Sequence, residues 1–423
     1  MTAPTMKPTT ESSAQGPVSA TPTPAPLESA ILGTYKRAPV ELVRGSGVYL
    51  YDAEGKAYLD FGSGIAVNSL GYDDAGLKAA LHAAAEGLIH TSNLYHTAPG
   101  ERLAATLVAR SFADKVFFCN SGAEANEGAF KIARRWARTQ GEAKHEIIAL
   151  RGAFHGRLFG TLAATDRPNY RLPFRPLAPG ISIFERDLKE LDAALNADTV
   201  AAVIVEPIQG EGGVRVIDHG FLRELRAVTA SRNIALIFDE IQCGLGRTGS
   251  LFAYEQTGVV PDMITLAKPL AGGLPMGAVL MTDSIASAMQ YGDHGTTFGG
   301  GPFVSVAVLT TLEVMERDGL VEHAGRVGAI LMDSLKRELS GVPGVKDIRG
   351  KGLMIGIELD RPCGDIVRRG LEAGLVANVT ADKVIRLVPP LIISEAEVKQ
   401  LVAILVPVIK AFLAEAPAAA AAD

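Results

Sequence analysis

The chain has 423 residues, 48% of them hydrophobic, and a formal net charge of −6 with dispersed basic residues. This length supports two domains or one large α/β unit with an appendage, and the charge argues against a nucleic-acid-binding surface. Its three cysteines lie far apart in the sequence, so they form no disulfide framework, and no apolar run of about 18 residues could span a membrane. We therefore expect a cytoplasmic protein of enzyme size.

Both ends of the chain are predicted to be tails. Residues 1–27 are rich in Pro, Thr, Ser and Ala, and such a segment buries too little apolar surface to offset its ordering entropy. They lack the compact apolar stretch of a secretory signal and the arginines of a transit peptide. Residues 416–423 are mostly alanine. We predict a disordered N-terminal tail and a frayed C-terminal one.

The segments next to the tails are predicted to form one smaller domain. Two strand-like runs within residues 41–61 flank Ala53-Glu54-Gly55-Lys56, which is typical of a hairpin turn. After about residue 303 the chain becomes helical, and residues 352–359 then form a β-like run. We expect residues 28–85 and 320–415 to combine into an α+β domain.

Residues 86–319 are predicted to form a large domain. Helical patterns, such as 122–138 and 219–232, separate several short apolar runs, at 115–119, 146–150, 201–205, 234–238 and 263–267. Continuous apolar strands separated by helices indicate a mainly parallel sheet covered on both faces, in which ligands gather at the carboxyl ends of the strands. The polar residues at or just after these ends are Asn120, Glu206, Asp239 and Lys268.

Lys268 and Asp239 together indicate one particular chemistry. A lysine amine forms a Schiff base with an aldehyde cofactor, and a carboxylate holds a pyridinium nitrogen protonated. The pair therefore suggests pyridoxal phosphate (PLP), although each residue alone is also consistent with an ordinary strand-end charge. No sequence pattern indicates a metal site, because the cysteines lack zinc spacing and no H-E-x-x-H occurs.

Three further segments are candidates for the same site, each with a plain structural alternative. Residues 120–126 precede a helix whose N-terminus could bind an anion, or Ser121 could simply cap it. Phe154 could stack on a flat ring and Arg157 could bind a carboxylate, or the two could be a core residue and a surface charge. Glu206 begins a glycine-containing run that is also compatible with a flexible loop.

The ordered motifs resemble the class III (subgroup II) PLP-dependent aminotransferases of fold type I. The resemblance extends from about Tyr35 to Leu413 and rests on GIAVN (64–68), SNLY (92–95), VFFCNSGAEANE (116–127), FHGR (154–157), EPIQGEGG (206–213), FDEIQCGLGRTG (238–249), TLAK (265–268), HGTTFGG (294–300) and IRLVPP (385–390). It implies an α/β fold whose large domain contains a mainly parallel, seven-stranded sheet. Within the family, the first three runs are most similar to those of enzymes that act on N-acetylornithine in arginine biosynthesis.

The resemblance implies a role for each matching residue toward PLP. Lys268 would form the Schiff base and move the proton, and Asp239 would pair with the pyridine nitrogen. The ring would stack on Phe154, with Gln242 near its phenolic oxygen. The phosphate would be held by Ser121, Gly122 and Ala123 and, from the other subunit of a homodimer, by Thr297 with the help of Thr296.

The same resemblance implies how substrates bind. Arg157 suits the α-carboxylate of N-acetylornithine and the γ-carboxylate of glutamate, while Arg386 suits glutamate's α-carboxylate. An idle Arg386 would be an uncompensated buried charge, so we expect Glu206 to pair with it when glutamate is absent. Ile65 stands where ornithine-specific relatives have tyrosine. Gly71-Tyr72-Asp73-Asp74 and Gly301 also depart from the usual family residues.

Several alternatives stay open at this point. The main expectation is transfer of the terminal amine of N-acetylornithine to 2-oxoglutarate, and the alternative amine donors are 4-aminobutyrate, ornithine, succinylornithine and a carrier-linked lysine precursor. An aminomutase of the same fold is a more distant alternative. A non-catalytic or nucleotide-binding α/β protein, with structural charges at its strand ends, is an alternative of a different class.

Overall fold

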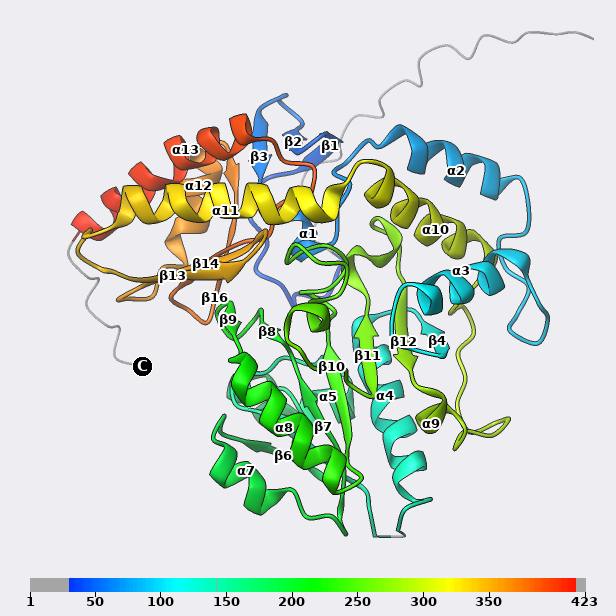
Figure 1. Ribbon diagram of the computed structural model, residues 1–423. Helices are drawn as coiled ribbons and strands as arrows, with labels where there is room; N and C mark the ends of the chain where they lie inside the picture. The colour runs from blue at the N-terminus through cyan, green and yellow to red at the C-terminus, as the bar shows by residue number, and fades with distance from the viewer. Residues whose placement is uncertain (1–29, 142, 416–423) are drawn as a thin grey trace, which may run out of the picture. The chain divides into compact units, whose positions relative to one another are not determined.

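The computed structural model describes residues 30–141 and 143–415 (Figure 1). The tails predicted at 1–27 and 416–423 lie outside these residues. The chain divides into two compact units, Met1–Val40 and Glu41–Asp423. Of the first unit, residues 30–40 contain bends and no helix or strand. The finer division of the second unit near residues 85 and 319 stays a prediction.

The second unit contains a seven-stranded sheet in the order β4-β12-β11-β10-β7-β5-β6. Only β12 runs antiparallel to its neighbours, so the prediction of a mainly parallel seven-stranded sheet is confirmed. The strands are β4 (Lys115–Cys119), β5 (Glu146–Leu150), β6 (Ile181–Phe184), β7 (Val200–Val205), β10 (Ala235–Asp239), β11 (Met263–Leu266) and β12 (Gly277–Met281). All five predicted runs match these bounds to within one residue, and β6 and β12 were not among the predicted runs.

The sheet is buried on both faces because successive side chains of each strand enter different cores. Ala235 and Ile237 of β10 belong to one apolar cluster, which includes residues of α4 (Gly122–Ala137). Leu236 and Phe238 belong to another, which includes Leu222 of α8 (His219–Ser231). Alternation of side chains across a strand explains why these runs are apolar throughout. Figure 1 shows both helices alongside the strands.

Short helices connect and cover the strands. The other helical segments before residue 320 are α1 (Ser63–Ala66), α2 (Ala75–Ala85), α3 (Ala98–Ala109), α5 (Phe159–Ala163), α6 (Pro168–Arg171), η1 (Leu172–Phe174), α7 (Leu188–Ala194), η2 (Ala253–Gln256), η3 (Lys268–Ala271), α9 (Asp283–Ala286) and α10 (Pro302–Arg317). A small hairpin of β8 (Ile208–Gln209) and β9 (Arg215–Val216) follows β7.

The two ends of the second unit share a sheet, as predicted. The hairpin predicted around residues 53–56 joins β2 (Tyr49–Asp52) to β3 (Ala57–Asp60), and β1 (Leu42–Ser46) pairs with β2. From the other end of the unit, β15 (Leu375–Val376) pairs in parallel with β3. A second sheet has the order β13-β14-β17-β16, with bounds Val345–Lys351, Met354–Leu359, Val384–Leu387 and Asn378–Thr380. These sheets and their helices form the expected α+β region.

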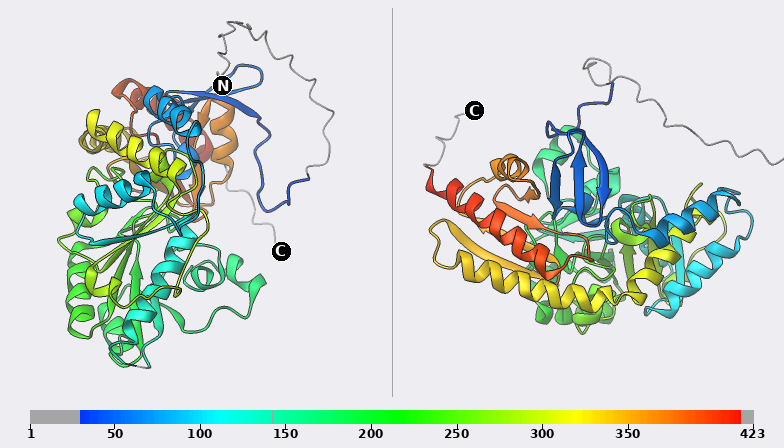
Figure 2. Two further views of the ribbon diagram at one scale, coloured as in Figure 1. Left: turned by 90° about the vertical axis from the view of Figure 1, so that its right-hand side faces the viewer. Right: turned by 90° about the horizontal axis from the view of Figure 1, so that it is seen from above.

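Three helices complete the C-terminal part of the chain. They are α11 (Leu320–Leu339), α12 (Asp365–Glu372) and α13 (Glu395–Ala414). Figure 2 shows α11 and α13 side by side, and the two helices pack against each other. Among the described residues, no helix combines the length and apolar character that a membrane span requires.

Candidate active site

An open cavity of about 440 Å³ lies at the carboxyl ends of the parallel strands. Parallel pairing of β10 with β7 and β11 places the residues that follow these strands at one edge of the sheet. The cavity also has an apolar wall, formed by Val67 and Leu274–Met276. The predicted site residues that line it are Ser121, Gly122, Ala123, Phe154, Arg157, Glu206, Asp239, Gln242 and Lys268.

Lys268 is the nucleophile candidate. Its backbone is left-handed, with φ of 28°, a conformation that is uncommon outside glycine and that is found preferentially at functional sites. No described residue hydrogen-bonds or ion-pairs with its amine. Burial lowers the pKa of Lys268 against the opposing effect of the Glu211 charge, which favours the neutral amine that attacks a carbonyl.

Asp239 is held at the end of β10 by three hydrogen-bond donors. Oδ2 accepts from Asn126 Nδ2 at 2.7 Å and from His155 Nδ1 at 2.8 Å, and Oδ1 accepts from Ile241 N at 3.1 Å. A carboxylate has about four acceptor positions, so one position on Oδ1 is left for a further donor. Because an ionised carboxylate only accepts, His155 must carry its proton on Nδ1. Asp239 is thus prepared to receive one N–H group from the cavity.

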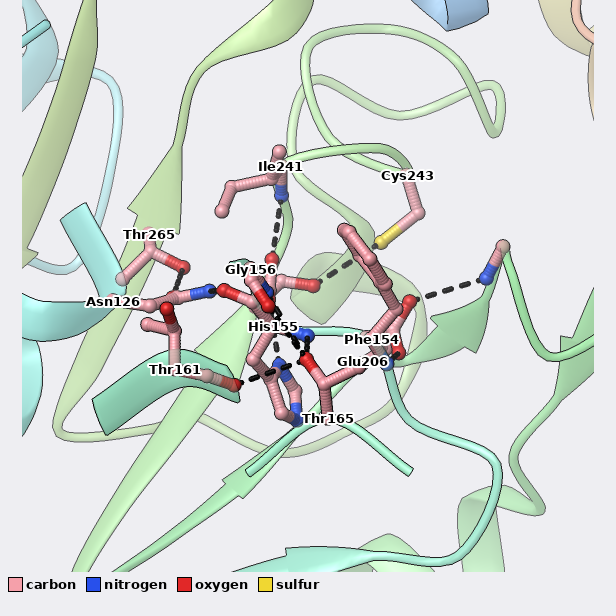
Figure 3. A network of polar contacts seen from close by, with 12 residues as sticks. Asn126, Phe154, His155, Gly156, Thr161, Thr165, Glu206, Ile241, Cys243 and Thr265 are labelled. Atoms are coloured by element: carbon pink, nitrogen blue, oxygen red, sulfur yellow. Dashed lines mark hydrogen bonds and ion pairs between the residues drawn. The ribbon is translucent and has the colours of Figure 1, made fainter. Parts of the chain in front are cut away.

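Asn126, which supports Asp239, was not predicted as a site residue from the sequence. Asn126 lies on α4 and accepts a hydrogen bond on Oδ1 from Thr265 Oγ1 at 2.8 Å, as Figure 3 shows. Its Nδ2 also donates to His155 O at 2.8 Å. Asn126 is fully buried in an otherwise small and apolar helix face, and this isolated buried amide is the signal that could have identified it.

The N-terminus of α4 forms the anion-binding end of the cavity. Ser121 is the N-cap, and its Oγ accepts from Glu124 N at 3.2 Å. The first N–H groups of a helix have no intrahelical acceptor, so those of Gly122 and Ala123 are suited to an anion, with the helix dipole adding to the attraction. The cap predicted for Ser121 and the anion-binding role are therefore compatible.

Phe154 and Arg157 add an aromatic ring and a cation to the cavity lining. Phe154 is half-buried, and its ring packs edge-to-face with Tyr170 at 6.5 Å between centroids. Arg157 is exposed, and its guanidinium lies over the Tyr170 ring at 3.8 Å. No carboxylate among the described residues forms an ion pair with Arg157. It is therefore available to a carboxylate that enters the cavity.

The expected pairing of Glu206 with Arg386 is wrong in this structure. Both Glu206 oxygens are taken by backbone donors, Phe154 N at 2.8 Å and Gly210 N at 3.1 Å. Burial raises the pKa of Glu206, which makes it a poorer partner for a cation.

Arg386 pairs instead with Glu211, in the same loop as Glu206. Burial works to raise the pKa of Glu211, but the Arg386 charge and hydrogen bond lower it overall. Arg386 Nη1 also donates to Gln242 Oε1 at 3.0 Å, and Nε donates to Asn378 Oδ1 at 3.1 Å. Although Arg386 does not line the cavity itself, Gln242 connects it to the cavity wall.

Three other predicted residues lie outside the cavity lining. Ile65 is 44% exposed on α1. Thr296 Oγ1 accepts from Asn120 Nδ2 at 3.2 Å, and Thr297 lines two separate hollows, one of them shared with His90. Within the described part of the chain, neither threonine reaches the cavity of Lys268.

A buried lysine amine, a carboxylate with one free acceptor position and an anion-binding helix end define a class of protein: an enzyme that uses an aldehyde cofactor carrying a basic ring and a phosphate. Pyridoxal phosphate fits these residues. Residues 33–409 match the family Aminotransferase class-III. The chain belongs to this family, whose members use PLP.

Similar sequences and structures agree with this assignment. The chain is 46% identical over 391 residues to acetylornithine aminotransferase 1 of Bordetella bronchiseptica, covering 92% of this chain and 100% of that one. It is 46% identical over 377 residues to acetylornithine aminotransferase of Methanocaldococcus jannaschii, covering 88% and 94%. The ornithine aminotransferase of Toxoplasma gondii, whose structure shows partial occupancy of PLP at its active site, has a TM-score of 0.86 at 33% identity, covering 90% and 92%.

Asn126→Leu tests the support of Asp239. The substitution keeps the side chain's size but removes the donor to Asp239 and the acceptor for the buried Thr265 hydroxyl. It should lower the free energy of unfolding of the protein without PLP by about 1–3 kcal/mol and weaken PLP binding. Urea unfolding and PLP titration measure the two effects. Asn196→Leu, which removes an exposed amide outside the cavity lining, is the control. Unchanged unfolding and PLP affinity in Asn126→Leu would contradict the assigned role.

Proposed function

We propose that the enzyme transfers the terminal amine of N-acetylornithine to 2-oxoglutarate. The observation that carries this proposal is the difference between its two arginines. Arg157 is free of carboxylate partners at the cavity, whereas Arg386 is buried and paired with Glu211. One arginine is thus ready for the carboxylate that both substrates share, and the other becomes available only when a second carboxylate displaces its partner. The names of the relatives support the choice of N-acetylornithine.

Different residues of the cavity would bind different parts of PLP. Ser121, Gly122 and Ala123, at the N-terminus of α4, would hold the phosphate. Asp239 would accept from the pyridine nitrogen at its free acceptor position and favour the protonated form of that nitrogen. Phe154 would support the ring face, and Gln242 would face the phenolic oxygen. When bound, PLP supplies an electron-withdrawing ring that stabilises negative charge on the substrate carbon.

Lys268 carries out the proton transfer. Its amine is the group that would hold PLP covalently. Burial lowers the pKa of Lys268, which favours the neutral amine and would let Nζ accept the proton from the substrate carbon that carries the amine. The same Nζ would hold this proton and return it in the same half-reaction. The opposite sequence, with 2-oxoglutarate as acceptor, regenerates the starting enzyme and releases glutamate.

The arginine pair accounts for the use of two different substrates in one site. In the N-acetylornithine half-reaction Arg157 binds the α-carboxylate and Glu211 neutralises Arg386. In the glutamate half-reaction Arg157 binds the γ-carboxylate, Glu211 moves aside, and Arg386 binds the α-carboxylate. A buried arginine without a partner is costly, so the Glu211 pairing stabilises the site when no second carboxylate is present.

We propose a homodimer in which Thr297 completes the phosphate site of the neighbouring subunit. Thr297 belongs to a loop that Asn93 holds through hydrogen bonds to Thr296 O and Gly299 O, both at 3.0 Å. Large apolar side chains in this loop and in the segment that contains Asn93 are exposed, which is unusual for a surface that only water covers. They are Leu88, Ile89, Leu94, Tyr95 and Phe298. A second copy would cover them and bring Thr297 to the phosphate, and we place this dimer in the cytoplasm.

A panel of amine donors tests the substrate. We expect kcat/KM for N-acetylornithine to exceed that for ornithine, 4-aminobutyrate and succinylornithine by about tenfold or more. N-acetylornithine combines a carboxylate for Arg157 with a neutral acyl group for the apolar wall, whereas ornithine and succinylornithine bring a further charge and 4-aminobutyrate lacks the acyl group. Steady-state assays with 2-oxoglutarate as acceptor measure the four values. A higher value for any of the other donors would overturn the assignment while leaving the aminotransferase family in place.

Arg386→Ala tests the two-arginine arrangement. Loss of Arg386 should slow the glutamate half-reaction by about 2 kcal/mol or more, roughly 30-fold, because glutamate's α-carboxylate then has no partner. Single-turnover reactions of the PLP enzyme with glutamate and with N-acetylornithine separate the two halves. Glu211→Gln should show the reverse preference, because Arg386 stays uncompensated with N-acetylornithine. Arg226→Ala, which breaks the Arg226–Asp262 pair outside the cavity, is the control. Equal losses in both halves for Arg386→Ala would refute the arrangement.

A further inference from the structure

Three hydrogen bonds hold the main chain at Glu211. Glu211 O accepts from Arg167 Nη2 and, at 2.7 Å, from Thr380 Oγ1. The preceding residue, Gly210, donates its N–H to Glu206 at 3.1 Å. These bonds tie the loop to segments on either side of it that are distant in the sequence. The backbone at Glu211 is therefore fixed, and its side chain is the part that can move.

The Glu211 side chain, by contrast, has one firm bond. Its Oε1 pairs with Arg386 Nη1. Its Oε2 lies 3.3 Å from Thr380 Oγ1, but this hydroxyl has a single proton and its shorter bond is to Glu211 O. The Glu211 side chain is 26% exposed, whereas that of Arg386 is 1% exposed. When a second carboxylate competes for Arg386, Glu211 is therefore the partner that can leave.

A Glu211 carboxylate that leaves Arg386 needs another cation. Burial works to raise the pKa of Glu211 and the Arg386 charge opposes it, so without this partner the carboxylate would be poorly stabilised. Arg157 does not serve, because it binds the γ-carboxylate of glutamate in the same half-reaction. Arg349 does not serve either, because it is already paired with Glu358 at 2.6 Å.

Arg167 is a cation that is both close and unpaired. In the part of the chain that the structure describes, no carboxylate forms an ion pair with it. Of its five N–H donors, one on Nη1 bonds Asp166 O at 3.1 Å and one on Nη2 bonds Glu211 O. The Asp166 carboxylate is itself paired with Arg151 at 3.2 Å. Because Arg167 is bonded to the carbonyl of Glu211, its guanidinium lies within the length of the Glu211 side chain.

We propose that Arg167 receives the Glu211 carboxylate when the α-carboxylate of glutamate displaces it from Arg386. The inference rests on the proposed function, in which Glu211 moves aside for glutamate, and adds the place to which it moves. With N-acetylornithine, Glu211 neutralises Arg386, and with glutamate it neutralises Arg167. The Glu211 carboxylate then has a cationic partner in both half-reactions. Arg167 is thus a positioning residue that acts through Glu211.

Arg167→Gln tests the role of the charge. The substitution keeps an N–H donor for Glu211 O but removes the cation. It should slow the glutamate half-reaction at least about 5-fold, mainly through weaker glutamate binding, and change the N-acetylornithine half-reaction less than about 2-fold. Arg167→Lys, which keeps the charge, should recover most of the loss. Single-turnover reactions of the PLP enzyme at varied concentrations of each substrate measure these effects.

Arg134→Gln is the matched control for this experiment. Arg134 also donates to backbone carbonyls, His145 O at 2.7 Å and Gly180 O at 3.1 Å, and it lies outside the cavity lining. Its loss should leave the ratio of the two half-reactions as in the wild type. Unchanged half-reactions in Arg167→Gln, equal losses in both, or a loss in Arg167→Lys as large as that in Arg167→Gln would overturn the proposal.

A double substitution shows whether Arg167 acts through Glu211. In a Glu211→Gln background, Arg167→Gln should cause no further change in the glutamate half-reaction, since no carboxylate is left for Arg167 to receive. Independent, multiplicative effects of the two substitutions would contradict the proposal.

The results separate this inference from the function on which it rests. Equal losses in both half-reactions for Arg386→Ala would refute the two-arginine arrangement and this inference with it. A selective loss in Arg386→Ala together with an unselective one in Arg167→Gln would overturn the role of Arg167 alone. If the wild type prefers a donor other than N-acetylornithine, glutamate is compared with that donor, and a loss confined to glutamate in Arg167→Gln still supports the inference.

Discussion

Parallel pairing of β7, β10 and β11 is the constraint on which the rest of the site depends. It brings the residues after each strand to one edge of the sheet, although Glu206, Asp239 and Lys268 are far apart in the sequence. Helix α4 packs on the same sheet and directs its N-terminus to that edge, which adds an anion site to the amine and the carboxylate. A shift of register in any of these strands would separate the groups that PLP must contact at once.

Burial determines what each charged group at this edge can do. Three donors bind the Asp239 carboxylate, while burial lowers the pKa of Lys268 and favours its neutral amine. Arg386 is buried but compensated by Glu211, whereas Arg157 stays exposed and without a carboxylate partner among the described residues. A buried charge needs a partner, and this rule explains the different roles of these groups. Lys268 can act as a nucleophile and Asp239 as an acceptor for a cationic ring. Arg157 and Arg386 can bind carboxylates under different conditions.

The sequence predicted the sheet and the principal chemistry well because both depend on local patterns. Continuous apolar runs predicted β4 and β5 to the residue, and strand-end polarity identified Asp239 and Lys268. The partner of Arg386 was predicted wrongly because Glu206 and Glu211 lie in one loop, and only the folded backbone shows that Phe154 N and Gly210 N occupy Glu206. The hydrogen bond from Arg167 to Glu211 and the role of Asn126 also depend on contacts between distant segments. The periodicity of hydrophobic residues in a sequence does not indicate contacts between distant segments.

The covalent attachment of PLP to Lys268 is the most direct test of the site. Borohydride reduction of the purified enzyme, followed by proteolysis and mass measurement, identifies the lysine that carries the cofactor. We predict that the added mass occurs on the peptide containing Lys268 and that Lys268→Ala abolishes it while the protein stays folded. Cofactor mass on a different lysine, or an unmodified wild-type chain after reduction in the presence of PLP, would contradict the assignment of the cavity.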